Sequence, residues 1–135
     1  MGEISISTNE RFELIDITYE VQKLLDDFDL DEGAVLIFTK HTTTALMINE
    51  KETGLLRDFK KIMKELVPEG REYEHNRIDN NADSHLRAIL LSSSLVVPVS
   101  NRRLELGSWQ RIFLVELDGP RTRKIIVKPL LSTGE

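Results

Sequence analysis

Imidazole, carboxylate and amide side chains gather in three short segments of the chain. The first covers residues 41–50 and reads His-Thr-Thr-Thr-Ala-Leu-Met-Ile-Asn-Glu. The second, residues 79–85, holds two carboxylates, two amides and an imidazole. The third, residues 106–110, reads Leu-Gly-Ser-Trp-Gln, and Glu-Leu-Asp-Gly-Pro-Arg follows at residues 116–121. Because such groups transfer protons, hold cations or bind phosphate, these segments form the candidate site.

Two of the three histidines are candidates for chemistry. His41 begins the first segment and His85 ends the second. Neutral imidazole serves near pH 7 both as a metal ligand and as a proton-transfer group, so we expect either role for both residues. A hydrogen-bonded structural histidine is the alternative for each, and His75 is interpreted in that way.

The carboxylates of the first two segments offer further ligands. Asp79 and Asp83 are four residues apart, as are Asn81 and His85, so these side chains can meet where a loop becomes a helix. Such a cluster can bind Mg²⁺ through oxygens, or Zn²⁺ through imidazoles and a carboxylate. The alternatives are helix capping and a phosphate site at the helix start. Glu50 is expected to act as a general base or metal partner, with a helix first-turn acid as the alternative.

The third segment supplies groups that suit a heteroaromatic or phosphorylated ligand. Trp109 can stack on a ring, although a lone tryptophan also serves in a core or an interface. Gln110 and Arg121 can bind polar ring atoms or phosphate, while Arg121 can instead hold the turn at residues 118–120. A serine-hydrolase pattern and a glycine-rich phosphate loop are absent from the sequence, which excludes those two enzyme classes.

The first half of the chain alternates between strand and helix periods. Ile4 and Ile6 alternate with polar residues, and a second apolar run follows, so we expect two early strands joined by a turn at residues 8–10, most simply as a hairpin. From Thr18 the apolar spacing is helical, with Asp16 or Thr18 as the capping residue. Two further strands are expected at residues 34–38 and 42–48.

The second half contains two more helices and a run of strands. Asn49 followed by Glu52 resembles a capping box for a helix that Pro68 and Gly70 end. A third helix is expected at residues 82–91, capped by Asn80 or Asn81. Strands are expected at residues 95–99, 102–106, 109–117 and 124–127. The pattern predicts an α+β fold, a mostly antiparallel β-sandwich with two to three helices, as a single domain over residues 1–135.

Composition narrows the class of protein. With 135 residues and 40% hydrophobic residues, the chain is long enough for one cored domain. The absence of cysteine excludes disulfides and thiolate chemistry, and with no signal-peptide pattern at the N-terminus we expect a soluble, cytoplasmic protein that contacts no membrane. A formal net charge of -5 argues against nucleic acid as a partner.

The three polar segments, in this order, resemble the motifs of the YjbQ-like family, also called secondary thiamine-phosphate synthase enzymes. The matching features are the His-Thr-Thr start and Asn-Glu end of the first segment, the Asp, Asn and Ala-Asp-Ser-His-Leu of the second, and Leu-Gly-Ser-Trp-Gln followed by Glu-Leu-Asp-Gly-Pro-Arg. Residues 92–94 and 102–103 depart from the usual turns of the family, which affects loop geometry and substrate preference.

The resemblance implies a β-sandwich with helices on one side and a homotrimer with sites near the subunit interfaces. It also implies a weak synthesis of thiamine phosphate from hydroxymethylpyrimidine diphosphate and thiazole phosphate. Because the departing pyrophosphate is highly charged, we expect a divalent cation, Mg²⁺ or Zn²⁺, to assist this reaction. A non-catalytic ligand- or metal-binding homotrimer and a purely structural trimer are the alternatives. Mapped onto this chain, the expected catalytic residues are His41, Glu50, Asp79 and His85, the substrate-binding residues are Asn81, Trp109, Gln110 and Arg121, and the metal ligands are His41, His85 and Asp83.

Overall fold

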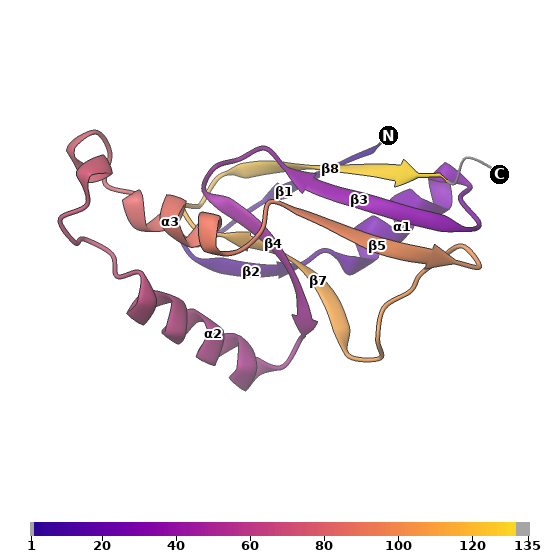
Figure 1. The fold of residues 1–135 in the computed structure, drawn as a ribbon, viewed down its shortest axis with the longest axis horizontal. Helices are drawn as coiled ribbons and strands as arrows, with labels where there is room; N and C mark the ends of the chain where they lie inside the picture. Colours follow the sequence, from indigo (N-terminus) through magenta and orange to yellow (C-terminus); the bar gives the residue numbers. More distant parts are fainter. Residues whose placement is uncertain (1, 132–135) are drawn as a thin grey trace.

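The computed structural model describes residues 2–131, which form an elongated α+β structure (Figure 1). In these residues the elements follow the order β1 (Gly2–Ser7), β2 (Glu13–Asp16), α1 (Thr18–Phe28), β3 (Gly33–Thr39), β4 (Thr44–Glu50), α2 (Thr53–Leu66), the 3-10 helix η1 (Glu74–Arg77), α3 (Ala82–Leu90), β5 (Ser94–Ser100), β6 (Arg103–Leu104), β7 (Gln110–Glu116) and β8 (Thr122–Leu130). The strands and helices predicted from periodicity are therefore present.

The described strands form two sheets. A five-stranded sheet has the order β1-β8-β3-β5-β6, and a three-stranded sheet has the order β2-β7-β4. Each pairing between these strands is antiparallel, which confirms the predicted fold class. The predicted early hairpin is wrong: β1 pairs with β8, whereas β2 pairs with β7 in the other sheet. Residues 8–12 therefore carry the chain from one sheet to the other.

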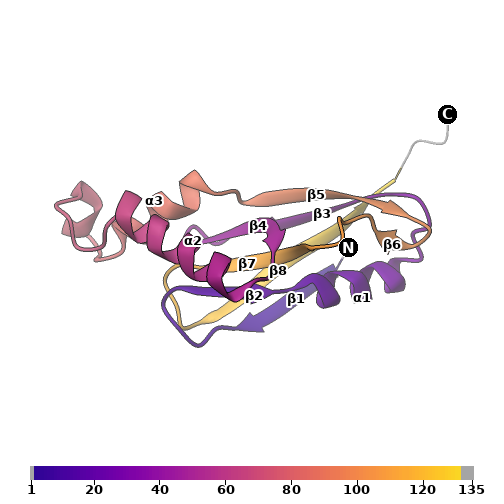
Figure 2. The same cartoon turned by 90° about the horizontal axis from the view of Figure 1, so that it is seen from below.

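Two apolar cores hold the layers together. The larger core lies between the inner faces of the two sheets and is closed by α1, which contributes Val21 and Leu25. The smaller core lies on the outer face of the three-stranded sheet, where Ala45 and Val115 pack against Met63 of α2. Figure 2 shows α1 and α2 beside different parts of this layered arrangement. The sheets and α3 thus form a fixed frame for the loops at one end of the sandwich.

The helix starts differ in part from the expected caps. For α1 the Asp16 carboxylate accepts the Thr18 N–H at 3.0 Å, as expected. For α2 the cap is Glu52, which accepts the N–H groups of residues 54 and 55, while Asn49 still belongs to β4. For α3 the Ala82 N–H donates to the Asn76 side chain at 3.0 Å, so neither Asn80 nor Asn81 caps this helix through its side chain. The side chain of Asn81 is consequently available for another contact.

Among residues 2–131, none of the helices combines the length and the apolar character needed to cross a lipid bilayer.

Candidate functional site

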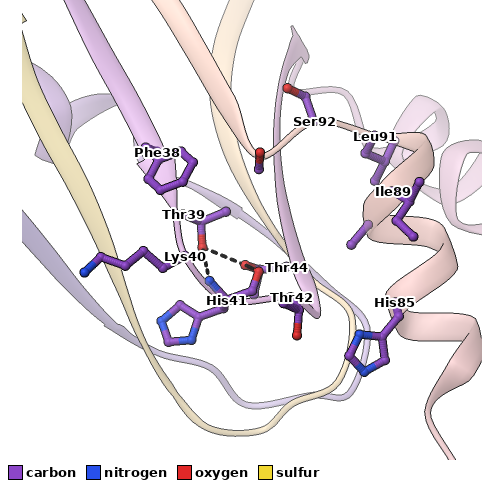
Figure 3. Close-up of a pocket in the computed structure, with 12 residues that line it drawn as sticks. Phe38, Thr39, Lys40, His41, Thr42, Thr44, His85, Ile89, Leu91 and Ser92 are labelled. Carbon is purple, nitrogen blue, oxygen red and sulfur yellow. Dashed lines mark hydrogen bonds between the residues drawn. The ribbon is translucent and has the colours of Figure 1, made fainter. Parts of the chain in front are cut away.

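A polar pocket of about 300 Å³ lies where the β3–β4 loop, the start of α3 and the β7–β8 turn meet. It adjoins a trough of about 640 Å³ that continues past Phe38 toward Ile89 of α3. Figure 3 shows the His41 ring on the side of β3 and the His85 ring on α3, with Thr42 between them. The polar pocket is lined by Lys40, His41, Thr42, Thr43, Asn81, His85, Asp118, Arg121 and Arg123.

Arg123 is the most firmly held cation of this pocket. Its guanidinium is 2% exposed, and its Nε donates to Oε1 of the fully buried Glu116 at 2.8 Å. Its Nη2 donates to Glu116 Oε2 and, at 2.8 Å, to Thr43 Oγ1. Within residues 2–131 the Nη1 group has no hydrogen-bond partner. A guanidinium fixed on two sides and free on the third is suited to bind an anion.

The buried side chain of Glu116, at the end of β7, connects the two sheets through hydrogen bonds. Besides Arg123 of β8, it accepts the Thr8 hydroxyl at 2.8 Å and the Asp118 N–H at 3.0 Å. Burial would raise the pKa of this carboxyl, but the arginine and these donors outweigh burial and leave the pKa below its ordinary value. Glu116 is therefore an anion that neutralises Arg123 from behind and leaves the pocket side of the guanidinium open.

His41 is held in one neutral tautomer. Its Nε2 accepts the backbone N–H of Lys124 at 3.0 Å, so the proton of the neutral ring resides on Nδ1. Burial and the charge of Arg123 lower the pKa of this imidazole, against a smaller opposing effect of Glu116. His41 thus contributes an N–H donor, and its basic nitrogen is already engaged.

His85, by contrast, keeps both ring nitrogens available. The ring is half-buried on α3, and neither nitrogen hydrogen-bonds to another residue of the described chain. This makes His85 the better candidate for proton transfer, since a general base must offer an unoccupied nitrogen to its substrate.

Asn81 and Arg121 meet at Asp118 beside these groups. The Asn81 Nδ2 donates to Asp118 Oδ2 at 2.9 Å, and the Arg121 Nε donates to the Asp118 backbone carbonyl at 3.0 Å. Arg121 therefore stabilises the turn at residues 118–120, which was one of its two predicted roles. It also lines the pocket, as its other predicted role, ligand binding, requires. The predicted residues His41, Asn81, His85 and Arg121 are brought together in one place.

Asp83 and Asp79 lie outside the pocket lining. Asp83 is 1% exposed and accepts two hydrogen bonds from Arg11, at 3.0 and 3.1 Å, while Arg87 lies at 3.4 Å. Its expected role as a metal ligand is corrected to that of a buried ion-pair partner, because both oxygens are engaged by guanidinium groups. Asp79 is exposed and accepts the N–H of the next residue at 2.9 Å, and it is absent from the lining of the polar pocket and of the trough.

Glu50, Trp109 and Gln110 lie at the other end of the three-stranded sheet. Glu50 pairs in register with Gln110, whereas Thr44, next to the pocket, pairs with Glu116. At about 3.4 Å per residue this places Glu50 about 20 Å from the pocket. Trp109 is 73% exposed, and Gln110 accepts the Gly107 N–H at 2.8 Å. Within one chain these three predicted site residues are separate from the histidines.

The residues of the pocket do not fit a resident divalent cation. Three cations line it, the only carboxylate in its lining is bonded to Asn81 and Arg121, and the free nitrogen that His41 would offer a metal is occupied. Within the described chain, no group of three or more histidine, cysteine or acidic residues is arranged to hold a metal ion. The donor set is suited to an anion instead.

Five residues of the pocket lining were not among the predicted site residues: Lys40, Thr42, Thr43, Asp118 and Arg123. A detectable signal existed for Arg123, because it occupies an inward position of a strand whose next two inward positions, Ile125 and Val127, are fully buried. A charged residue in such a position requires a partner, and Glu116 at the end of an equally apolar strand supplies it.

The fold and the pocket define an α+β, two-sheet domain with a cationic, imidazole-bearing pocket at one end. The model of the family described as "UPF0047 protein YjbQ-like" matches residues 2–131. A UPF0047 protein of Archaeoglobus fulgidus is 53% identical over 95% of this chain and 99% of its own length. The protein YugU of Bacillus subtilis is 36% identical over 93% and 95%. The chain therefore belongs to the YjbQ-like, UPF0047 family.

A solved structure supports the same assignment. The crystal structure of a YbjQ-like protein of unknown function from Sulfolobus solfataricus P2 superposes with a TM-score of 0.92, at 43% identity, and covers 95% of this chain and 94% of that one. Its fold is therefore shared over nearly the whole length.

Proposed function

We propose that the pocket binds the phosphate groups of a small heteroaromatic metabolite and that the protein is a weak thiamine-phosphate synthase. The observation that carries the proposal is Arg123, a buried guanidinium with one face open to a pocket that Lys40 and Arg121 also line. Phosphate groups are recognised by such arginine donors. The adjoining trough, with Phe38 and Ile89 in its lining, offers an apolar wall for a ring.

The proposed reaction needs stabilisation of a leaving group more than it needs a strong base. The thiazole nitrogen attacks the methylene carbon of the pyrimidine diphosphate, the carbon–oxygen bond breaks, and pyrophosphate leaves with the electron pair. Positively charged donors preorganised around the departing oxygens stabilise this charge. In this chain Arg123, Arg121 and the Nδ1–H of His41 would be those donors, and His85 would exchange a proton with the pyrophosphate.

A non-catalytic homotrimer that binds the same kind of ligand is the second candidate. Support for self-association comes from exposed apolar side chains: Ile89, which lines the trough, is 75% exposed, Leu90 of the same helix is 62% exposed, and Val96 of β5 is 59% exposed. Large exposed apolar side chains favour contact with another protein surface. The two candidate functions use the same pocket and differ in whether the bound ligand is converted to product.

The test is an assay of thiamine phosphate formation from the two substrates, with and without Mg²⁺, in the parent protein and two matched arginine variants. Arg121→Ala removes a pocket cation, whereas Arg102→Ala removes a cation that pairs with Asp29 and Asp31 outside the pocket lining. We expect turnover that falls at least tenfold in Arg121→Ala and is retained in Arg102→Ala. Absence of turnover in the parent would contradict the enzymatic proposal, and equal loss in both variants would contradict the assignment of the pocket.

A further inference from the structure

His75 stands next to the pocket without lining it. It belongs to η1, the short helix that precedes α3, and it is absent from the residues that surround either cavity. Its ring lies against the ring of His85, with centroids 4.7 Å apart and planes at 69°. The sequence interpretation treated His75 as structural, but these contacts connect it to a residue that faces the pocket.

A chain of hydrogen bonds connects His75 with the opposite wall of the pocket. The His75 Nε2 lies 3.0 Å from Asn81 Oδ1, and Asn81 Nδ2 lies 2.9 Å from Asp118 Oδ2. Asp118 in turn accepts from Arg121 Nη2 at 3.3 Å. Asn81 is 8% exposed, so its amide depends on these two partners.

The chemistry of the partners fixes the direction of each bond. An ionised carboxylate only accepts hydrogen bonds, so the Asn81 Nδ2 must face Asp118 and the Asn81 Oδ1 must face His75. The His75 Nε2 therefore carries a hydrogen and donates a hydrogen bond to the Asn81 Oδ1. This donation is available to neutral His75 in one tautomer and to its protonated form alike, whereas the other neutral tautomer would leave Asn81 Oδ1 without a donor.

His85 has no equivalent support of its own. Within residues 2–131 no hydrogen bond holds its ring, so its orientation depends on packing, and the edge-to-face contact with His75 is the aromatic contact it makes. Edge-to-face pairs have a preferred geometry, and such a contact restricts the rotation of the imidazole.

We infer that His75 is a positioning residue that orients two walls of the pocket, the His85 imidazole through ring contact and Arg121 through Asn81 and Asp118. The inference rests on the proposed function only for what the pocket binds. The geometry itself can be measured in protein without any ligand. Residues that hold a reacting group in place through a second hydrogen bond commonly affect both affinity and rate.

The experiment uses two conservative variants of His75, each of which keeps one of its two contacts and removes the other. His75→Phe keeps an aromatic ring against His85 and removes the donor, whereas His75→Gln keeps an N–H donor near the position of Nε2 and removes the ring. Arg77→Ala, an exposed residue of the same short helix, is the matched control. The chain has three histidines, so long-range proton–nitrogen spectra of the imidazoles can be assigned by variants.

In the ligand-free parent we expect the His75 spectrum of an Nε2–H imidazole and one ordered set of Asn81 side-chain amide signals. His75→Phe should shift and broaden the Asn81 amide signals while the His85 signals change little, and His75→Gln should produce the reverse. With inorganic pyrophosphate as the probe, each variant should bind about two- to tenfold more weakly, the range expected for one lost hydrogen bond or ring contact. Arg77→Ala should match the parent throughout.

An Nδ1–H tautomer of His75 would overturn the inference, as would Asn81 and His85 signals that both variants leave unchanged. These results concern ligand-free protein, so they are independent of the proposed function. Failure of the parent to bind pyrophosphate would contradict that function and leave the positioning role to be decided by the spectra.

Discussion

Replacing Glu116 with glutamine removes the charge that balances Arg123 and changes the side-chain volume very little. Glu116 is fully buried and Arg123 is 2% exposed, so the variant leaves a guanidinium without its counter-ion inside the sandwich. Breaking one side of a buried ion pair destabilises a protein by about 3–5 kcal/mol. At about 3–4 °C per kcal/mol for a domain of this size, the Tm should fall by about 10–20 °C.

Urea unfolding followed by far-ultraviolet circular dichroism measures this effect better than fluorescence, because the lone Trp109 is 73% exposed and reports poorly on burial. The double variant Glu116→Met with Arg123→Met is the control, since replacing both partners by apolar groups leaves no unpaired charge and should recover most of the loss. A Glu116→Gln protein as stable as the parent would refute the view that this pair holds the two sheets together.

Glu116 also makes the free energy of unfolding depend on pH. Its folded-state pKa lies below the ordinary value of 4.5, so its contribution to the free energy of unfolding is complete above that value and is lost as pH falls through the lower folded pKa. His41 should add a separate component. Its folded pKa lies below 6.5, so the unfolded chain takes up the proton first, and stability should decline as pH falls from that value toward the folded pKa. His41→Gln should abolish this decline in urea titrations over pH, and an unchanged profile would contradict the lowered pKa of His41. Asp83→Ala should destabilise the chain by about 3 kcal/mol or more in urea unfolding, because Arg11 and Arg87 lose their shared carboxylate, and normal stability would show that Asp83 is free for another role. Glu50→Ala should keep the affinity for pyrophosphate in calorimetric titration, because Glu50 lies at the other end of β4, and a loss of affinity would show that another copy of the chain brings Glu50 to the pocket.

The local elements could be predicted from sequence because they depend on short-range periodicity. Val21 and Leu25 share one helical face, and α1 begins and ends where that spacing does. Strand partners could not be predicted in the same way, because the pairing of β1 with β8 depends on which distant strand completes a buried face. The assumed hairpin failed for that reason.

The candidate site was also predicted only in part, because residue types can be recognised in the sequence but distances across the fold cannot. His41, Asn81, His85 and Arg121 were predicted by residue type, and each adjoins a loop or helix start at the same end of the sandwich. Glu50 was grouped with them because it closes the same motif, but a seven-residue strand carries it away from His41. A motif that is continuous in sequence therefore spans both ends of the molecule when an extended strand forms its middle.

The pairing of Arg123 with Glu116 could be identified only from the structure. Arg123 shares the buried face of β8 with Ile125 and Val127, and Glu116 ends a continuous apolar run in β7. Their partnership exists only because two different sheets face each other. Their importance for the pocket follows from this long-range contact, which supplies a rigid guanidinium and leaves one nitrogen open.

The most direct test of the account is calorimetric titration of the metal-free protein with inorganic pyrophosphate, run beside titrations with Mg²⁺ and with Zn²⁺ alone. We predict saturable binding of pyrophosphate that weakens with added salt and at least tenfold in Arg121→Ala, because the pocket is built from cations and N–H donors. Stoichiometric binding of Zn²⁺ or Mg²⁺ without measurable binding of pyrophosphate would contradict the assignment of an anion pocket.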